Sequence, residues 1–255
     1  MPTIINGTAA SETLPGTTGD DIINGLAGDD TLKANAGNDV LHGGAGKDRL
    51  EGGAGSDTAD YSDSVAGVSV NLFTGFGQFD AFGQGGDAQG DKLFSVENVT
   101  GSKFNDILQA GESSATLIGN AGNDILKGLA SSPASDSLNG GAGVDTLSGR
   151  GGSDHFVYSS TSDSQLGVGN RDVVTDFSHV QGDKLDLAAI DAKAGGGNDA
   201  FTFIGDKGFT AAGQVRFVAE GDHTLVEVNT SGTGGAEMQV ELKGLVNLQA
   251  NDFIL

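Results

Sequence analysis

Apolar residues recur with a period of nine through two long stretches of the chain. From Gly16 the sequence reads GTTGDDIIN, GLAGDDTLK, ANAGNDVLH, GGAGKDRLE and GGAGSDTAD, and a degenerate unit precedes these in phase, so that residues 7–60 form six units. A second array covers residues 101–157, and an isolated copy, GDAQGDKLF, stands between the arrays at 86–94. A repeat this regular indicates a solenoid built from one short structural unit.

Each unit of nine predicts one tight turn and one short strand. Positions 1, 2 and 4 are rich in glycine, which suits a turn with positive φ and close backbone approach. Position 8 holds one large apolar residue between two flanking residues, which is the pattern of a three-residue strand with a single inward side chain. Two units, or 18 residues, would then wind one full coil containing two parallel strands.

Position 6 is an aspartate in most units of both arrays. In a coil of two units, position-6 carboxylates of alternate units stack at about 4.8 Å, the spacing of neighbouring strands. Glu12 and Ala115 stand at this position in place of aspartate. The predicted columns are Asp21–Asp39–Asp57, Asp30–Asp48, Asp106–Asp124–Asp145 and Asp136–Asp154.

Stacked carboxylates predict a bound cation. Two like charges at this separation repel by about 1 kcal/mol in water and by several times more at a partly buried site. A cation between the turns reverses the sign of this interaction. Carboxylate and carbonyl oxygens without His or Cys select a hard ion, and a flexible ring of six or more oxygens suits Ca²⁺ better than Mg²⁺.

The charge balance narrows the classes of partner. The 255 residues include 35 acids and 13 Lys plus Arg, giving a net charge of −22. Of the acids, 27 are Asp and 8 are Glu, and together with 44 glycines this composition favours turns over helices. Nucleic-acid binding is disfavoured, because phosphates need a basic face, and so is electrostatic docking to an anionic membrane.

Signals for disulfides and for membrane insertion are missing from the sequence. The chain has no cysteine, so it relies on neither disulfides nor thiolate metal sites. The N-terminus, MPTIING, has neither the basic nor the apolar region of an ordinary signal peptide. No apolar run approaches 18 residues, so we expect no transmembrane helix.

The remaining sequence predicts a division into four parts. They are the first array (7–60), a connecting β segment with the isolated repeat (61–100), the second array (101–157) and a C-terminal β domain (158–255). In the connecting segment, Val68, Val70 and Leu72 alternate with polar residues and predict a strand, followed by a loop over 75–86. In the C-terminal domain we expect strands at 201–204, 214–219, 224–229 and 237–242, and one short helix at 185–194.

The repeat units resemble those of the RTX (repeats-in-toxin) family, whose G-G-x-G-x-D-x-U-x units form a parallel β-roll. The resemblance implies several Ca²⁺ ions between the turns of alternate repeats, held by turn carbonyls and position-6 carboxylates. Matching unit by unit, the implied ligands are Asp21, Asp30, Asp39, Asp48, Asp57, Asp106, Asp124, Asp136, Asp145 and Asp154.

The C-terminal third has a resemblance of its own. Residues 151–190, and the stretch from there to Leu255, resemble the segment that follows the roll in serralysin-type domains. The ending Asn251-Asp252-Phe253-Ile254-Leu255 resembles the uncleaved C-terminal signal of type I secretion. The resemblance therefore implies an extracellular protein with a type I exporter as a partner.

Signatures of catalysis are absent from the sequence. The four histidines form no H-E-x-x-H zinc pair, and no G-x-S-x-G elbow occurs. The paired carboxylates are already explained as ligands, and a cation would depress their pKa below the range of a general acid. We therefore interpret the chain as an all-β, secreted, calcium-binding protein with two β-roll arrays and no enzymatic activity.

Three roles fit this interpretation. The favoured role is a non-catalytic structural or binding protein, which could contact extracellular polysaccharide or a cell surface. The second is an auxiliary module of an enzyme of the alginate epimerase, lipase or serralysin type. That role predicts a catalytic domain upstream, and Met1 stands only six residues before the first repeat. The third is a membrane-active RTX protein, which the −22 charge and the lack of an amphipathic apolar helix disfavour. The extracellular target, the number of occupied calcium sites and the oligomeric state stay open.

Overall fold

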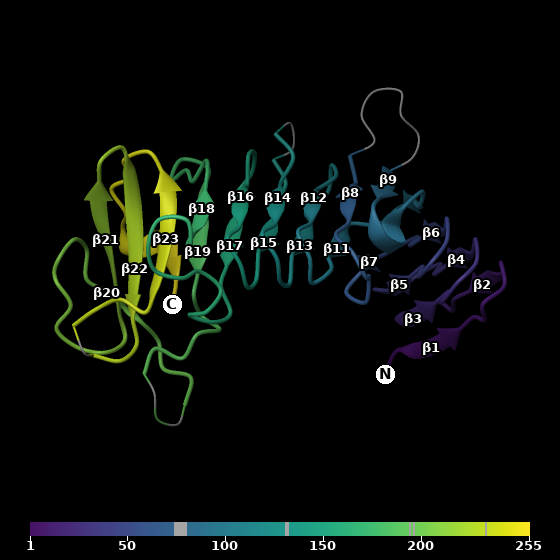
Figure 1. Cartoon of the computed structure of the whole chain (residues 1–255), viewed down its shortest axis with the longest axis horizontal. Helices are drawn as coiled ribbons and strands as arrows, with labels where there is room; N and C mark the ends of the chain where they lie inside the picture. The colour runs from purple at the N-terminus through teal and green to yellow at the C-terminus, as the bar shows by residue number, and fades with distance from the viewer. Residues whose placement is uncertain (74–80, 131–132, 194, 196, 233) are drawn as a thin grey trace. The chain divides into compact units, whose positions relative to one another are not determined.

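The chain forms two compact units of short β-strands. The computed structural model describes residues 1–73, 81–130, 133–193, 195, 197–232 and 234–255, with residues 81 and 82 described by their backbone alone. The units are Met1–Ala121 and Gly122–Leu255, so the boundary falls within the predicted second array. In each unit the strands lie side by side as successive rungs (Figure 1).

The first unit contains strands that are mostly three or four residues long. They are β1 (Thr3–Asn6), β2 (Thr13–Pro15), β3 (Asp21–Asn24), β4 (Thr31–Lys33), β5 (Val40–His42), β6 (Arg49–Glu51), β7 (Thr58–Asp60), β8 (Ser69–Asn71), β9 (Ala81–Gln84), β10 (Lys92–Phe94), β11 (Asn98–Thr100), β12 (Ile107–Gln109) and β13 (Thr116–Ile118), with a 3₁₀ helix η1 (Gly86–Ala88) after β9.

Strands of the first unit alternate between two sheets, as a roll requires. One sheet has the order β1-β3-β5-β7-β11-β13 and the other β2-β4-β6-β10-β9-β8-β12. Ile23 of β3 pairs in parallel with Leu41 of β5, and Leu14 of β2 with Leu32 of β4, so each coil takes 18 residues. The predicted all-β parallel β-roll is confirmed.

The core between the two sheets is one side chain wide in each strand. Most of these strands have one buried residue between two that are half-buried or exposed. The buried residues are the predicted position-8 residues, and Ile23, Leu32, Leu41, Leu50, Leu108 and Leu117 are fully buried. Each such side chain contributes about 1.5–3 kcal/mol of hydrophobic stabilisation.

The connecting segment departs from the prediction in one place. The strand predicted at 68–72 is β8, whereas the predicted loop over 75–86 is wrong from residue 81 onward, because β9 pairs antiparallel with both β8 and β10. Residues 74–80 lie outside the described part of the chain. Gly83 permits this close packing, since a Cβ there would lie 2.6 Å from the Ala88 carbonyl oxygen.

The second unit continues with short strands and then has longer ones. They are β14 (Ile125–Lys127), β15 (Ser137–Asn139), β16 (Thr146–Ser148), β17 (His155–Val157), β18 (Asp172–Val174), β19 (Lys184–Asp186), β20 (Thr202–Phe203), β21 (Gln214–Glu220), β22 (His223–Asn229), β23 (Met238–Lys243) and β24 (Phe253–Ile254), with a 3₁₀ helix η2 (Ala250–Asp252) before β24.

An antiparallel sheet extends one side of the second roll. One sheet has the parallel order β15-β17-β19-β24, and the other has β14-β16-β18-β23-β22-β21-β20. Strands β23, β22 and β21 form an antiparallel meander, and β23 pairs in parallel with β18. The four strands predicted in the C-terminal region are confirmed as β20, β21, β22 and β23.

The helix predicted at 185–194 is wrong. Residues Lys184–Asp186 form β19, in which Leu185 pairs with Phe156 of β17 on one side and with Phe253 of β24 on the other. Leu185 and Leu187 are both buried, with a polar residue between them. The alternation of a strand therefore prevails over local helix propensity, because tertiary pairing buries these leucines.

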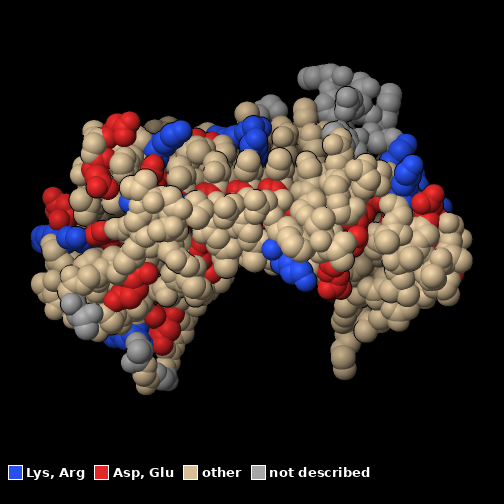
Figure 2. Space-filling view, viewed as in Figure 1, with Lys and Arg blue, Asp and Glu red and all other residues tan. Residues whose placement is uncertain are grey.

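The surface shown in Figure 2 is mostly uncharged, with separate patches of acidic and basic side chains. The ten predicted ligand aspartates contribute little to the molecular surface, because all of them are buried. None of the helices in the described ranges has the length and apolarity that a membrane-spanning helix requires.

A matched pair of substitutions on β12 tests the one-residue core. Leu108 is fully buried, whereas its neighbour Ile107 is 45% exposed. Leu108→Ala should lower the free energy of unfolding by about 2–5 kcal/mol, because it leaves a cavity between the sheets. Ile107→Ala should change it by less than about 1 kcal/mol. Urea unfolding in millimolar calcium measures both values, and equal losses would contradict the inward assignment of position 8.

Candidate metal centre

The predicted aspartate columns of the first unit form hydrogen-bonded ladders. The backbone N–H of Asp21 donates to Oδ1 of Asp39 at 2.7 Å, and the N–H of Asp39 donates to Oδ1 of Asp57 at 2.9 Å. In the other column the N–H of Asp30 donates to Oδ1 of Asp48 at 2.8 Å. Each carboxylate therefore lies against the backbone of the rung before it.

The second unit repeats this arrangement. The N–H of Asp124 donates to Oδ1 of Asp145, and that of Asp136 donates to Oδ1 of Asp154, both at 2.8 Å. Asp106 lies in the first unit, where its Oδ1 accepts a hydrogen bond from the Val68 N–H at 2.7 Å. The predicted step from Asp106 to Asp124 would join the two units and stays a prediction.

Three further aspartates extend the ladders beyond the residues predicted from sequence. Oδ1 of Asp91 accepts from the Asp48 N–H at 2.8 Å, Oδ1 of Asp172 from the Asp145 N–H at 2.8 Å, and Oδ1 of Asp183 from the Asp154 N–H at 3.0 Å. All three are buried. Oε2 of Glu97 takes the same position above Asp57, at 2.9 Å from its backbone nitrogen.

Inserted segments hide these aspartates from a search based on period. The ladder partners are separated by 43, 27 and 29 residues instead of 18. The local pattern D-x-U survives in each case, as Asp91-Lys92-Leu93, Asp172-Val173-Val174 and Asp183-Lys184-Leu185. An aspartate two residues before the inward apolar residue of a strand therefore predicts a ladder position better than the glycines of the turn do.

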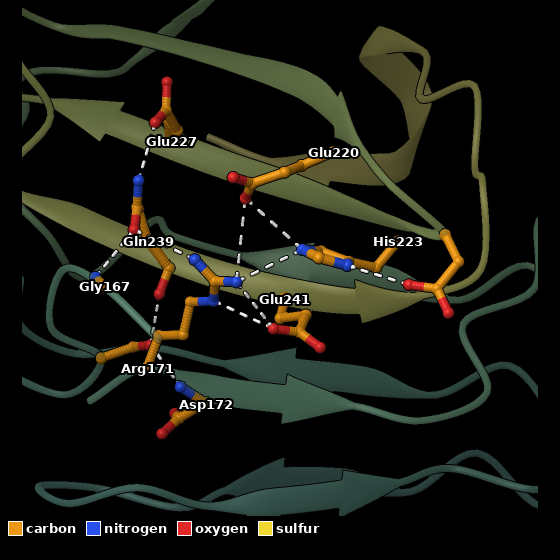
Figure 3. Close-up of polar contacts among 10 residues, drawn as sticks. Gly167, Arg171, Asp172, Glu220, His223, Glu227, Gln239 and Glu241 are labelled. Carbon is orange, nitrogen blue, oxygen red and sulfur yellow. Dashed lines mark hydrogen bonds and ion pairs between the residues drawn. The ribbon is translucent and has the colours of Figure 1, made fainter. Parts of the chain in front are cut away.

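A charged network fixes the backbone next to Asp172. Arg171 is 4% exposed, and its Nε and Nη2 atoms contact Oε2 of Glu241 on β23 at 3.0 and 2.9 Å (Figure 3). Its Nη2 also lies 3.3 Å from Nε2 of His223 on β22. The N–H of Asp172 donates to the Ser164 hydroxyl at 2.8 Å. The antiparallel meander therefore holds Asp172 in place above Asp145.

The second carboxylate oxygen is buried without a hydrogen-bond partner in most rungs. This applies to Oδ2 of Asp30, Asp39, Asp48, Asp57, Asp145, Asp154 and Asp172. A buried, ionised oxygen of this kind is costly unless a charge or a donor compensates it. The same atom recurs at the same place in successive turns, so the ladders present rows of uncompensated oxygens.

Carbonyl oxygens of neighbouring turns converge on these carboxylates. A Cβ added to Gly25 would lie 2.7 Å from Oδ2 of Asp30 and 2.5 Å from the Gly43 carbonyl oxygen. A Cβ on Gly128 would likewise lie 2.6 Å from Oδ2 of Asp136 and 2.2 Å from the Gly149 carbonyl oxygen. Glycine at position 1 therefore leaves room at these two turns for carboxylate and carbonyl oxygens, whereas Ala34 holds the same position in the unit of Asp39.

Burial raises the pKa of several ladder carboxyl groups. Removal from water is the largest cause in each case, and the neighbouring aspartate adds to it. The pKa rises to about 6 for Asp48 and Asp57, to about 7 for Asp154 and to about 9 for Asp172, where the charge of Asp145 contributes next after burial. The ladder therefore favours either protonation or a compensating positive charge.

The donor set fits a hard cation. It consists of carboxylate and backbone carbonyl oxygens, which Ca²⁺ and Mg²⁺ prefer over nitrogen or sulfur ligands. Within the described ranges no three His, Asp or Glu side chains form a ready-made cluster, so a cation would need the turn carbonyls as well. A flexible mixture of this kind, repeated at successive turns, suits Ca²⁺.

A protein-family model matches the chain in both repeat arrays. Residues 6–38, 24–59, 100–132 and 131–164 match the RTX calcium-binding nonapeptide repeat, in four copies. The extracellular lipase LipA from Serratia marcescens is similar over 97% of this chain and 40% of its own, with 21% identity and a TM-score of 0.43. This chain therefore spans about two fifths of the lipase's length.

Two repeat modules of an epimerase are similar as well. The AlgE6R2 subunit of the Azotobacter vinelandii mannuronan C5-epimerase has 27% identity over 62% of this chain and 92% of its own, with a TM-score of 0.44. The AlgE6R3 subunit has 24% identity over 62% of this chain and 77% of its own, with a TM-score of 0.31. Comparison with curated protein sequences gives no match.

The two-sheet roll with aspartate ladders at its turns defines a parallel β-roll protein of the nonapeptide-repeat class. The matched segments, which together cover residues 6–59 and 100–164, are RTX calcium-binding nonapeptide repeats. The matched repeat is a calcium-binding repeat, and all ten position-6 aspartates predicted as ligands lie within the matched segments.

Two glycine substitutions test whether the turns are filled by ladder carboxylates. A Cβ on Gly43 would lie 2.5 Å from Oδ2 of Asp48, whereas a Cβ on Gly19 would meet no atom within 4 Å. Gly43→Ala should destabilise the folded protein by about 1–3 kcal/mol, because Asp48 must leave the ladder. Gly19→Ala should be neutral or slightly stabilising. Thermal unfolding measures both, and an equal effect would contradict the crowded turn.

Proposed function

We propose that this chain is a secreted protein whose β-roll folds around several Ca²⁺ ions outside the cell and then serves a structural or binding role. The observation that carries the proposal is the row of buried, unpartnered Oδ2 atoms at successive turns. Neutralising these atoms would convert the electrostatic cost of burying them into stabilising contacts. Because such sites barely exist in the unfolded chain, binding energy becomes folding energy.

The residues that would hold the ions are the ladder aspartates. They include the ten predicted from sequence and the three that extend the ladders, Asp91, Asp172 and Asp183. Bound Ca²⁺ would supply the positive charge that the ladder lacks. In rungs such as Asp39, Asp48 and Asp145 the Oδ1 atom accepts the neighbouring backbone N–H and orients the carboxylate, so Oδ2 and the turn carbonyls would be available to the ion.

We infer a non-catalytic role for the same residues. Oδ1 is engaged by a backbone donor in rungs such as Asp39, Asp48 and Asp145, and a bound cation would depress the carboxyl pKa below the range of a general acid. The ladder carboxylates are therefore suited to holding ions and poorly suited to proton transfer. Extracellular polysaccharide or a cell surface would be the partner of such a scaffold, and a type I exporter would deliver it.

Calcium removal tests the proposal directly. Far-ultraviolet circular dichroism should show a coil-like chain in chelator and a β-rich one after millimolar Ca²⁺ is added. Each site would add about 2.7 kcal/mol of stability at a hundredfold excess of ion over Kd. An unchanged β spectrum and melting temperature in chelator would refute the proposal, and Mg²⁺ at the same concentration is the control ion.

A pair of aspartate substitutions tests which aspartates of the repeat hold the ions. Asp39 lies in the middle of a ladder, between Asp21 and Asp57, whereas Asp60 is outside the ladders and accepts only the Ser62 N–H at 2.8 Å. Asp39→Asn can retain its hydrogen bond but loses its charge, so the calcium midpoint for folding should rise several-fold. Asp60→Asn should leave it nearly unchanged, and equal midpoints would contradict the assignment.

Truncation tests the proposed export signal. Deleting residues 252–255 should retain the protein inside cells that express a type I exporter. Phe203→Ala is the matched control, because it removes the ring 5.0 Å from that of Phe253 while leaving the C-terminal sequence intact. Undiminished secretion of the truncated chain, or equal retention of both variants, would contradict a signal in these residues.

A further inference from the structure

A groove on the first unit has no ladder aspartate among the described residues of its lining, although the hydroxyl of its Tyr61 donates to Oδ2 of Asp91 at 3.1 Å. It has a volume of about 490 Å³ and is lined by residues at the ends of β3, β5 and β7, by the loop that follows β7, and by Asp87 of η1. His42 and Asp60 contribute from the outer face of the sheet, at the strand positions next to the buried core residues. The volume lies within the range of small-ligand pockets, about 300–1,000 Å³.

The charge of the groove is negative. Its lining includes the carboxylates of Asp60, Asp63 and Asp87, and none of the described residues that line it is lysine or arginine. Nε2 of His42 lies 3.8 Å from Oδ2 of Asp60. Asp63 is exposed, so its charge faces solvent at the mouth of the groove. A positively charged ligand group is complementary to this surface.

Two large apolar side chains complete the lining. Leu26 is 55% exposed and Val65 is 79% exposed, so both offer apolar surface that a ligand could cover. Leu26 also has a φ of 76°, at a repeat position where Gly44 and Gly53 take the left-handed conformation. A leucine there is conformationally unfavourable, and its exposure means that the core does not compensate for it.

We propose that this groove binds a lysine or arginine side chain, presented by a peptide with a neighbouring apolar residue. The carboxylates would pair with the cationic head, and Leu26 and Val65 would cover the aliphatic stem and the apolar neighbour. A calcium ion accounts less well for the groove, because an ion uses oxygen ligands only and leaves the apolar lining without a role. The proposal goes beyond the calcium-binding function and concerns a basic partner.

Binding of a dipeptide probe tests the proposal on the full chain in saturating calcium. N-acetyl-leucyl-arginine amide should shift amide resonances of residues around the groove in two-dimensional NMR spectra. Its citrulline counterpart has nearly the same shape without the charge, and it should bind at least about twofold more weakly. Raising the salt concentration should weaken binding of the arginine probe but not of the citrulline probe.

Variants separate the groove from the rest of the acidic surface. Asp63→Asn should weaken the arginine probe by about two- to fivefold, the range for an exposed charge pair, and Val65→Ser should weaken both probes. Asp206→Asn removes an exposed charge that is not among the groove residues and should have no effect. Circular dichroism of each variant in calcium verifies its fold.

Three results would overturn the proposal. They are equal binding of the arginine and citrulline probes, equal effects of Asp63→Asn and Asp206→Asn, and displacement of the arginine probe by additional calcium at constant ionic strength. The last result would assign the groove to a metal ion. Since the probe can be titrated whether or not calcium drives folding, failure here is distinguishable from failure of the proposed calcium function.

Discussion

The structure depends on a carboxylate that each turn of the roll buries. The backbone N–H of one rung donates to Oδ1 of the aspartate one coil further along, and this bond fixes the register between coils. The bond satisfies only half of the carboxylate, since Oδ2 remains buried without a partner in most rungs. The feature that specifies the roll therefore also opposes its formation until positive charge is supplied.

The thin core makes this electrostatic condition decisive. A globular domain of similar size packs several layers of apolar side chains, whereas each strand here contributes one inward residue, such as Leu41 or Leu50. The 44 glycines add to the entropy lost on folding. The conformational entropy lost on folding thus opposes hydrophobic burial and the ladder hydrogen bonds. The stability of the roll therefore becomes sensitive to whether its buried carboxylates are neutralised.

The sequence predicts the regular part of the molecule well and its interruptions poorly. A fixed period determines which residues face inward and which aspartates stack, so the parallel roll and the pairs Asp21–Asp39 and Asp136–Asp154 follow from spacing. Inserted segments break the period, so Asp91, Asp172 and Asp183 escape a prediction based on spacing, although the local pattern D-x-U marks each of them. Strand β19 was missed for a related reason, because its pairing with β17 and β24 outweighs its helical propensity.

The two kinds of sheet in the second unit balance buried charge differently. At the antiparallel meander the chain supplies its own cations, since Arg216 of β21 pairs with Glu227 of β22, and Arg171, just before β18, pairs with Glu241 of β23. The ladder aspartates receive backbone N–H donors, which carry no net charge. With 13 basic residues against 35 acids, internal cations cannot serve every rung. Arg171 directly precedes Asp172, the first ladder residue beyond the second array. A carboxylate that an arginine neutralises, Glu241, and a carboxylate that only backbone N–H groups orient, Asp145 or Asp172, therefore lie close together at this point of the fold.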